Sequence, residues 1–389
     1  MQRKPVPARH DWQAAAEQHG FNFHSPDGTV YWDESHCYVF TLADIETKLE
    51  DPAAEIEGMC YDIVARAIRD DEILNRLKIP APYWDFIASS WEKRERHLYG
   101  RLDFCFDANG PSKLYEYNAD TPTSLFESAV FQWIWLEQLR ERGVLPATAD
   151  QFNSLHERLV DALSRFGLNG TLHLAATGES TEDMGTVNYL ADCASQAGLQ
   201  AITLAIEDIG ITTDGRFTDT QDRVIEALFK LYPWEWLLTE DFARHIPGSG
   251  CRFIEPAWKT ILSNKGLMAL LWEAYPGHPN LLPCYFDGDP RAADIGPRYV
   301  KKPIYSREGA NIQLVLSGRA SHRPITSDGP YGAEGHVLQA YHPLPRFQGR
   351  RPVCGVWLVA GEPAGLGVRE GDDDVTTDAA RFVPHIILD

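Results

Sequence analysis

The chain has 389 residues, of which 44% are hydrophobic, so it can bury a large core and is expected to form two or three structural units of one globular protein. Its formal net charge of -20 argues strongly against nonspecific binding to nucleic acid or to anionic membranes, which requires a basic surface. The sequence has no secretion signal, no apolar run long enough to span a membrane and no Cys-x-x-Cys pair among its seven cysteines, and we therefore expect a cytoplasmic protein with reduced thiols.

The first predicted elements are helices. From Thr41 the run TLADIETKLEDPAAEIEGMCYDIVARAI has a helical pattern that opens with a Thr-x-x-Asp cap and should kink or restart near Pro52. A second helix is expected over residues 83–97, and it leads into two short segments, RLDF and YEYN, in which polar and apolar residues alternate. Alternation with a period of two predicts strands.

The segment between these two strands predicts a hairpin. Asn109 and Gly110 lie between them, and an Asn-Gly pair flanked by alternating segments is the strongest short-range hairpin signal. Pro111 follows and cannot donate the hydrogen bond of a tight turn, which favours a longer loop. A symmetric longer loop would keep the pairing of the strands, whereas a bulge would break it.

The turn brings four polar side chains to one patch of sheet, with Asp103 opposite Glu116 and Arg101 opposite Asn118. Facing carboxylates repel, and a fold tolerates them best when a cation lies between them. Two carboxylates and an amide oxygen suit Mg²⁺, so we predict Asp103, Glu116 and Asn118 as metal ligands. The guanidinium of Arg101 is suited to phosphate. The alternative interpretation is a solvated polar face on an edge hairpin.

Two helices are expected after the hairpin, over residues 124–142 and 149–166. A strand, a helix and a strand then follow within residues 171–209, which is the β-α-β pattern of an open α/β layer. The aromatic and acidic run over residues 232–242 is interpreted as core at the edge of a cleft. A short helix begins at Asn264, and the rest of the chain is mostly strand, expected over residues 298–304, 311–317, 336–344, 352–360 and 363–370.

Two lysines come from separate elements of this last part. Lys265 lies in the first turn of the short helix, and Lys302 ends an apolar strand that leads to a glycine-containing turn at residues 306–310 and then to another strand. The sequence has neither a Walker loop nor a Rossmann fingerprint. A strand-turn-strand cover over phosphates, with two lysines from different elements, is instead the arrangement of ATP-grasp enzymes. Either lysine alone is more commonly a surface charge, but the apolar neighbours of Lys302 favour a functional role.

Two further segments suit a nucleotide. The run LQAYH at residues 338–342 is similar to a strand that holds adenine, with a backbone edge for hydrogen bonds and an aromatic ring for stacking. Arg369 ends a predicted strand just before three aspartates at residues 372–374. It is either the ion-pair partner of these aspartates or a second arginine for phosphate.

Together the blocks RLDF and YEYNAD, EPAWKTILSNK, KPI-x-x-R-x-G-x-N-I and LQAYHPLP resemble the synthetase domain of glutathionylspermidine synthase and its stand-alone homologues. The resemblance covers about residues 31–388. It implies an α/β (α+β) protein with an ATP-grasp fold of circularly rearranged elements, and a C-N ligase that uses ATP and Mg²⁺ to phosphorylate a carboxylate, which an amine then attacks. About thirty residues precede the matching region, so we expect no additional amidase domain.

The resemblance also implies a role for individual residues. The metal ligands would be Asp103, Glu116 and Asn118, and the arginines that stabilise phosphate transfer would be Arg101 and Arg369. The ATP-binding residues would be Arg101, Lys265, Lys302, Arg307, Gly309, Gln339, Ala340, Tyr341 and His342. The substrate-binding residues would be Thr121 and Thr123 for a peptide and Glu182 and Asp183 for a polyamine.

With these roles the chain divides into three parts of one compact enzyme. Residues 1–170 would hold the N-terminal helices and the metal-binding hairpin, residues 171–260 an α/β substrate region, and residues 261–389 the nucleotide-binding region. Neither a Ser-His-Asp nor a Cys-His arrangement is apparent, as expected for a ligase that needs no protein nucleophile.

We therefore expect an ATP-dependent carboxylate-amine ligase that joins a peptide or amino acid to a polyamine or another amine. Its partners would be small molecules, with glutathione and spermidine left open, and the sequence specifies no oligomeric state. A nucleotide-binding protein that has lost ligation and acts through a partner is the first alternative, and a phosphotransferase that stops at the acyl phosphate is the second.

Overall fold

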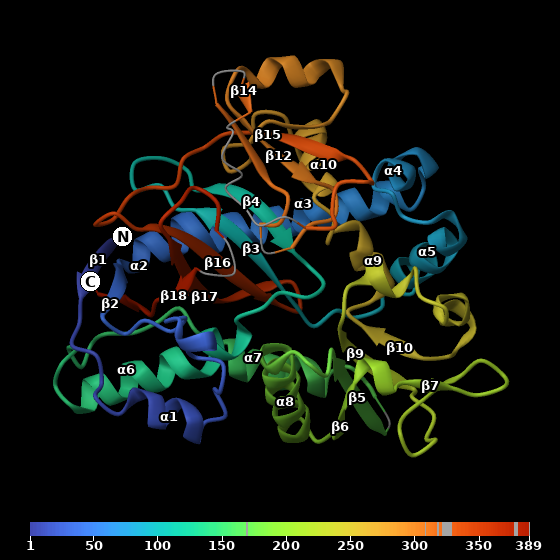
Figure 1. Cartoon of the computed structure of the whole chain (residues 1–389), viewed down its shortest axis with the longest axis horizontal. Helices are drawn as coiled ribbons and strands as arrows, with labels where there is room; N and C mark the ends of the chain where they lie inside the picture. Colours follow the sequence, from blue (N-terminus) through green and yellow to red (C-terminus); the bar gives the residue numbers. More distant parts are fainter. Residues whose placement is uncertain (169, 308, 317–318, 321–328, 377–379, 389) are drawn as a thin grey trace.

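The computed structural model describes residues 1–388 except 169, 308, 317–318, 321–328 and 377–379. Within this part of the chain the strands form five sheets, which the helices surround (Figure 1). A parallel layer with a crossing helix lies beside antiparallel sheets. The predicted α/β (α+β) class is therefore confirmed.

The N-terminal helices follow the predicted pattern. Thr41 caps α2 (Leu42–Ile45) through reciprocal hydrogen bonds with Asp44, and a π-helical turn at Glu46–Glu50 connects α2 to α3 (Asp51–Ala67). Pro52 is the second residue of α3, where its missing N–H is tolerated. The regular α-helix therefore restarts just before Pro52, as predicted. The other helices of the N-terminal half are α1 (Trp12–Gln18), α4 (Asp71–Arg76), α5 (Trp84–Glu92), α6 (Gln132–Glu141) and α7 (Leu155–Ser164).

The predicted hairpin is β3 (Tyr99–Cys105) and β4 (Lys113–Asn118), and its partners come from the far end of the chain. The sheet order is β18-β17-β16-β3-β4, with β16 (Arg351–Val359), β17 (Glu362–Gly371) and β18 (Arg381–Phe382). All seven residues of β3 are buried. The hairpin thus forms the edge of a sheet whose other strands lie about 250 residues further along the sequence, as in the pairing of Arg101 with Trp357.

The strands of the hairpin pair in the predicted register at the end away from the turn, which we call the functional end, but the pairing next to the turn differs. Asp103 pairs with Glu116 and Arg101 with Asn118, whereas nearer the turn the pairing shifts by one residue. The connection is the longer loop 106–112, in which the carboxylate of Asp107 accepts the Asn109 N–H at 2.8 Å. A bulge at Tyr115 restores the register, so the bulge keeps the pairing that we expected it to break.

The central layer is a parallel sheet in the order β10-β9-β5-β6, formed by β5 (Thr171–Ala176), β6 (Gln200–Ala205), β9 (Ala227–Leu231) and β10 (Arg252–Ile254). The helix α8 (Thr181–Gln196) connects β5 to β6 as predicted. A small ribbon of β7 (Gly210–Ile211) and β8 (Phe217–Thr218) follows. The aromatic run over residues 232–242 contains α9 (Trp234–Leu237), whose Trp234 is fully buried and whose Trp236 is exposed.

A third, antiparallel sheet has the order β11-β15-β12-β13-β14. Its strands are β11 (Cys284–Phe286), β12 (Tyr299–Pro303), β13 (Gln313–Leu316), β14 (Arg319–Ala320) and β15 (His336–Ala340). The helix α10 (Gly266–Ala274) packs against β11 and β15. The strands predicted for the last part of the chain are therefore present, but they belong to two different sheets.

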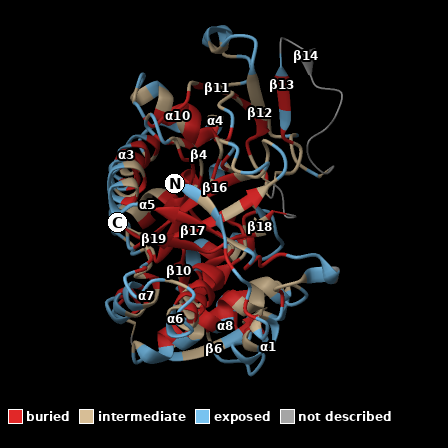
Figure 2. Cartoon of the chain, turned by 90° about the vertical axis from the view of Figure 1, so that its left-hand side faces the viewer, coloured by how far each residue is buried: buried red, intermediate tan, exposed pale blue. Residues whose placement is uncertain are grey.

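The first and last strands flank β2 in one sheet at one end of the molecule (Figure 1). The strand β2 (His36–Phe40) pairs antiparallel with β1 (Gln2–Pro5) and parallel with β19 (His385–Ile387). Buried residues follow β16, β17 and the central layer through the interior, while the helices expose their outer faces (Figure 2). Among the described residues, no helix combines the length and the apolarity that a membrane crossing needs.

His385 in β19 is a fully buried histidine with a fixed tautomer. Its Nε2 accepts the Phe152 N–H at 3.1 Å, so Nδ1 carries the proton and donates to Oε1 of Gln132 at 3.0 Å. Burial lowers the pKa of His385 to about 3. Protonation would remove the acceptor of the Phe152 N–H, so the folded state favours the neutral ring.

Candidate active site

One cavity, of about 180 Å³, collects most of the predicted site residues. The hairpin sheet supplies one wall and the β12–β15 sheet another. The predicted residues that line it are Arg101, Asp103, Glu116, Asn118, Thr121, Thr123, Lys302, Arg307, Gly309, Gln339, Ala340, Tyr341, His342 and Arg369. Residues that lie more than 250 positions apart in the sequence, such as Arg101 and Arg369, therefore meet at one site.

Arg101, Asp103 and Asn118 form a hydrogen-bonded group at the functional end of the hairpin. Arg101 donates from Nε and Nη2 to the two carboxylate oxygens of Asp103, at 2.6 and 3.0 Å, and Asn118 Nδ2 donates to Asp103 Oδ2 at 3.0 Å. The remaining guanidinium nitrogen, Nη1, donates to the carbonyl of Thr123 at 2.5 Å. Arg101 and Asp103 are both buried, so this fork is held rigidly.

Glu116 faces the two predicted lysines. Lys265 Nζ lies 3.0 Å from Glu116 Oε2 and also donates to the carbonyl of Ser306 at 2.9 Å. Burial by itself would raise the pKa of Glu116, but the charges of Lys265 and Lys302 lower it to about 2. Lys265 does not line the main cavity, yet it lines a small adjoining polar pocket that Glu116 shares. The site therefore presents an ionised carboxylate between two cations.

Basic side chains offset the repulsion between the carboxylates of Asp103 and Glu116. Arg101 neutralises Asp103 and Lys265 neutralises Glu116, so the facing carboxylates do not by themselves require a metal ion. Within the described residues, no cluster of three histidine, cysteine, aspartate or glutamate side chains could hold a metal. The predicted ligand set contains only two carboxylates, and its third member is the side-chain amide of Asn118.

The bulge residue Tyr115 links the hairpin to the opposite sheet. Its carbonyl accepts from Lys302 Nζ at 3.1 Å and from Gln339 Nε2 at 3.4 Å, and its hydroxyl donates to the carbonyl of His342 at 2.6 Å. Burial lowers the pKa of Lys302, and Glu116 opposes this effect. The irregular residue of β4 thus connects the predicted metal-binding strand to the predicted adenine strand.

The glycine-containing turn reaches over the site through Arg307. Its Nη1 donates to Oγ1 of Thr121 at 2.5 Å, its Nη2 donates to Oε1 of Glu235 at 3.2 Å, and its guanidinium lies over the ring of Trp236. Gly309 has a φ of +73°, which suits glycine in a tight turn. Glu308, between them, lies outside the described residues. Arg307 therefore contacts both the loop after β4 and the helix α9.

Arg369 and the acidic pair differ in their placement. Arg369 lines the cavity, and of the nearby aspartates Asp372 pairs with Arg350 and Asp374 with Arg351. Glu182 and Asp183 lie half-buried in the first turn of α8, and they line neither the main cavity nor the small adjoining pocket. The structure therefore brings Arg369 to the cavity but not the acidic pair.

The sequence did not reveal the small residue that accommodates Arg101. A Cβ added to Gly355 of β16, which pairs with Asp103, would lie 2.6 Å from Cδ of Arg101. Two residues further along β16, the ring of Trp357 packs against the guanidinium of Arg101, whose carbon Cζ lies 5.5 Å from the ring centre. Gly355 and Trp357 share one face of β16, and only the pairing of distant strands shows that this face carries Arg101.

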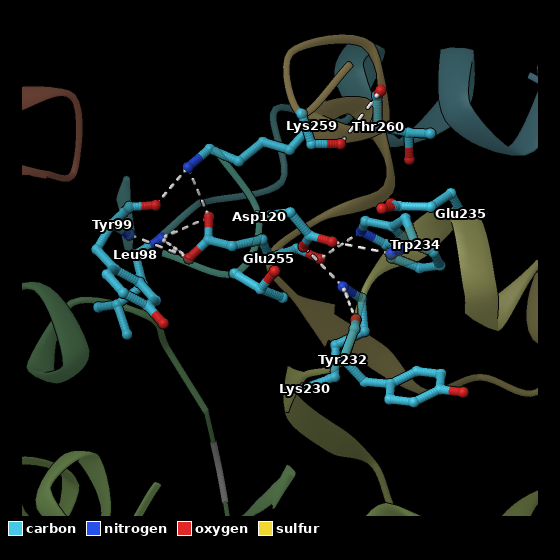
Figure 3. A network of polar contacts seen from close by, with 12 residues as sticks. Leu98, Tyr99, Asp120, Lys230, Tyr232, Trp234, Glu235, Glu255, Lys259 and Thr260 are labelled. Carbon is cyan, nitrogen blue, oxygen red and sulfur yellow. Dashed lines mark hydrogen bonds and ion pairs between the residues drawn. The ribbon is translucent and has the colours of Figure 1, made fainter. Parts of the chain in front are cut away.

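Two buried ion pairs anchor the hairpin at its two free ends (Figure 3). At the end of β4, Asp120 accepts from Lys230 Nζ at 2.7 Å and from the Trp234 N–H at 2.9 Å. The side chains of Asp120 and Lys230 are 1% and 0% exposed. Because Lys230 is in β9, this pair attaches the loop that carries Thr121 to the central layer.

The second pair holds the start of β3. Glu255 accepts from the N–H groups of Leu98 and Tyr99 and pairs with Lys259 at 2.9 Å, and Lys259 also donates to the carbonyl of Tyr99 at 2.6 Å. Both side chains are fully buried. Lys230 and Lys259 are not among the predicted site residues, although each lies within an apolar run of the sequence, as Lys302 does.

The sequence matches the protein family described as glutathionylspermidine synthase preATP-grasp over residues 3–388. A Haemophilus influenzae protein named "Putative acid--amine ligase" is 42% identical over 380 residues, which cover 95% of this chain and 94% of that protein. Trypanothione synthetase of Crithidia fasciculata is 25% identical and the bifunctional glutathionylspermidine synthetase/amidase of Escherichia coli 26% identical. The matches cover 83% and 92% of this chain but only 52% and 60% of those proteins.

Among solved structures, a glutathione synthetase-like effector, GSS30, from Globodera pallida in its apo form superposes with a TM-score of 0.51 over 98% of both chains, at 11% identity. This similarity shows a shared fold and supports the predicted ATP-grasp architecture. The prediction of a C-N ligase agrees with the names of the relatives and is confirmed at the level of the enzyme class. The match over nearly the whole sequence confirms the predicted resemblance: the chain belongs to the glutathionylspermidine synthase preATP-grasp family.

Proposed function

We propose that this protein phosphorylates a small carboxylic acid with ATP and transfers the acyl group to an amine. The observation that carries the proposal is the convergence, in one cavity and its adjoining pocket, of an oxygen-rich hairpin with cations from four other elements. Arg369 and Lys302 line the cavity, Arg307 covers it, and Lys265 pairs with Glu116 at its edge. Clustered cations of this kind neutralise the charge that develops when a phosphoryl group is transferred.

The residues of the hairpin fit Mg²⁺ in their chemistry. Asp103, Glu116 and Asn118 would hold the ion through carboxylate and amide oxygens, which are the donors that Mg²⁺ prefers. The lowered pKa of Glu116 supports this assignment, because the carboxylate is ionised without a metal ion. When bound, Mg²⁺ would supply charge neutralisation to the phosphates of ATP.

The cations have separate roles in the proposed reaction. Lys265 and Lys302 would bind the phosphates of ATP, while residues 339–342 would hold the adenine. Arg101 and Arg369 would orient the acid and stabilise the phosphoryl group as the carboxylate attacks it. The attack of the carboxylate on the terminal phosphate releases ADP; the amine then attacks the carbonyl carbon of the acyl phosphate, phosphate leaves, the nitrogen gives up a proton, and an amide bond is formed. No side-chain nucleophile is needed in this sequence of steps.

The substrates are proposed by class. A peptide or amino acid would bind at Thr121 and Thr123, both of which line the cavity, and a polyamine or another amine would bind near carboxylates. Glu182 and Asp183 are the predicted carboxylates, and Glu235, which accepts from Arg307, is a further one close to the cavity. The names of the relatives, which include glutathionylspermidine and trypanothione, support a peptide and a polyamine as the first substrates to test.

The test is release of ADP by the purified protein with Mg·ATP and pools of small carboxylic acids and amines, followed by mass spectrometry of the ligated product. ADP release should require both an acid and an amine. Glu116→Gln should abolish it, whereas Asp287→Asn, which changes an exposed carboxylate paired with Lys301, should not. Binding of a nonhydrolysable ATP analogue without ADP release for any pair would favour the protein that has lost ligation, and ADP release with an acid alone would favour the phosphotransferase.

A further inference from the structure

A second cavity, of about 850 Å³, shares no lining residue with the candidate active site. It lies where the ends of α3 and α5 meet the end of α7 and the turn between β16 and β17, and we call it the α5 cavity. Its volume is in the range of cavities that hold small organic ligands. None of the family-derived assignments above involves a residue of this cavity.

Aromatic side chains form one wall of the α5 cavity. The rings of Trp91 and His97 each lie 5.2 Å from that of Trp258, and Tyr61 lies 6.0 Å from Trp91. Trp258 is 2% exposed and its indole N–H donates to the carbonyl of Glu95 at 3.0 Å, which fixes the wall. Trp91 is only half-buried, so part of its ring is accessible from the cavity. Such a wall suits a planar aromatic molecule.

Arginines surround this wall. Five line the cavity, against four carboxylates, in a chain whose net charge is -20. Arg165 pairs with Asp161, but for Arg69, Arg94 and Arg96 the described residues provide no ion pair or side-chain hydrogen bond. Positive charge is therefore locally available for an anionic group.

A polar atom inside the cavity wall also lacks a partner. Nε2 of His97 shares a hydrogen bond with the hydroxyl of Tyr61 at 3.1 Å, whereas its Nδ1 is buried and has no partner among the described residues. Buried polar atoms are normally satisfied, so a ligand with a hydrogen-bonding group would complete this environment.

We propose that the α5 cavity binds a small planar aromatic anion, with its ring against Trp91 and its charged group at Arg94 and Arg96. The inference is independent of the proposed ligase reaction, because it involves none of the residues assigned to that reaction. It adds to the protein a second ligand site, for an aromatic carboxylate, sulfonate or phosphate.

Arg94 allows a test in which the charge is removed without a loss of stability being expected. It follows α5 at the position where helices usually have glycine, with a φ of +53° and its N–H donating to the carbonyl of Trp91 at 2.8 Å. Arg94→Gly therefore removes the guanidinium and relieves backbone strain at the same time. Lys78 is the matched control, since this exposed cation also follows a helix, α4, with a φ of +60°, and it lies outside the cavity.

The probe is naphthalene-2-sulfonate, titrated by calorimetry into the full chain in the presence of a saturating Mg²⁺ complex of a nonhydrolysable ATP analogue. We expect one saturable site, and binding about tenfold weaker in Arg94→Gly, as for loss of one charge-assisted contact. Lys78→Gly should bind as the unsubstituted protein does, and the neutral naphthalene-2-sulfonamide should bind more weakly than the sulfonate. Trp91→Leu should weaken binding of both compounds.

Thermal unfolding of Arg94→Gly and Lys78→Gly should show that neither variant is less stable than the unsubstituted protein. The proposal is overturned if no saturable binding occurs, if Arg94→Gly and Lys78→Gly bind the sulfonate equally well, or if the sulfonamide binds as tightly as the sulfonate. Failure of the ligase assay would leave each of these outcomes interpretable, because calorimetry does not depend on turnover.

Discussion

Replacement of Lys230 by methionine should destabilise the fold more than any exposed lysine substitution. Lys230 Nζ lies 2.7 Å from Asp120, donates to the carbonyl of Tyr232 at 3.0 Å and lies 4.5 Å from the ring centre of Trp234. Methionine fills a similar volume but leaves the Asp120 carboxylate buried without a countercharge. Breaking a buried ion pair by removing one partner costs about 3–5 kcal/mol, and we expect a loss of this size in the free energy of unfolding.

The matched control is Lys301→Met. Lys301 pairs with Asp287 at the same distance, 2.7 Å, but the two side chains are 29% and 43% exposed instead of 0% and 1%. Exposed pairs contribute about 0–1 kcal/mol, so this variant should unfold almost as the unsubstituted protein does. Urea unfolding followed by circular dichroism measures both losses under the same conditions.

A double variant separates the buried charge from the lost contacts. In Lys230→Met with Asp120→Asn, the amide oxygen can still accept the Trp234 N–H, but no charge is buried. The double variant should therefore be more stable than Lys230→Met alone, with a coupling energy of about 1–3 kcal/mol. Equal losses in Lys230→Met and Lys301→Met would refute the reasoning, because burial would then not decide the strength of the pair.

Three further predictions concern single residues. Since the pKa of His385 is lowered to about 3 from an ordinary value of 6.5, its neutral form favours the folded state above pH 6.5, and this contribution should be lost as the pH falls from 6.5 to 3. Unfolding free energy should decrease by up to about 1.4 kcal/mol per pH unit from this group, and His385→Gln should show a correspondingly shallower pH dependence, whereas an unchanged slope would contradict the assignment. Gly355→Ala should displace Arg101 and lower ATP turnover about tenfold or more with the fold retained, while Gly371→Ala, where an added Cβ meets nothing within 4 Å, should not; equal activities would show that Arg101 adapts. Gly58→Ala, at an exposed and open position within α3, should raise the free energy of unfolding by about 0.5–1 kcal/mol, and a measured decrease would indicate a contact that the structure lacks.

The local parts of the candidate site were predictable because they depend on residues close in sequence. Alternation of side chains and the Asn-Gly pair were enough to place Asp103 opposite Glu116 and Arg101 opposite Asn118. The bulge at Tyr115 was not predictable in its effect, since the loop and the bulge compensate each other. The assigned roles of these residues stay predictions until the ligase and its variants are assayed.

The balance of charges at the site depended on distant residues. The facing carboxylates of Asp103 and Glu116 predicted a cation between them, whereas the structure pairs Asp103 with Arg101 and Glu116 with Lys265, which lies about 150 residues further along the sequence. The three-part division of the chain likewise stays a prediction, and the structure adds that residues 1–170 and 261–389 contribute strands to the same sheet.

The sequence by itself determined many of the helices and strands, the pairing of Asp103 with Glu116 and of Arg101 with Asn118, the lysine in an apolar strand, Lys302, and the family. Each of these depends on periodicity, turn chemistry or a contiguous motif, which act over short stretches of chain. The tertiary structure alone decided that β3 pairs with β16, that Gly355 makes room for Arg101, and that Lys230 and Lys259 hold the two ends of the hairpin. These features depend on which distant surfaces are buried together, because only burial turns an ordinary lysine or glycine into a structural requirement.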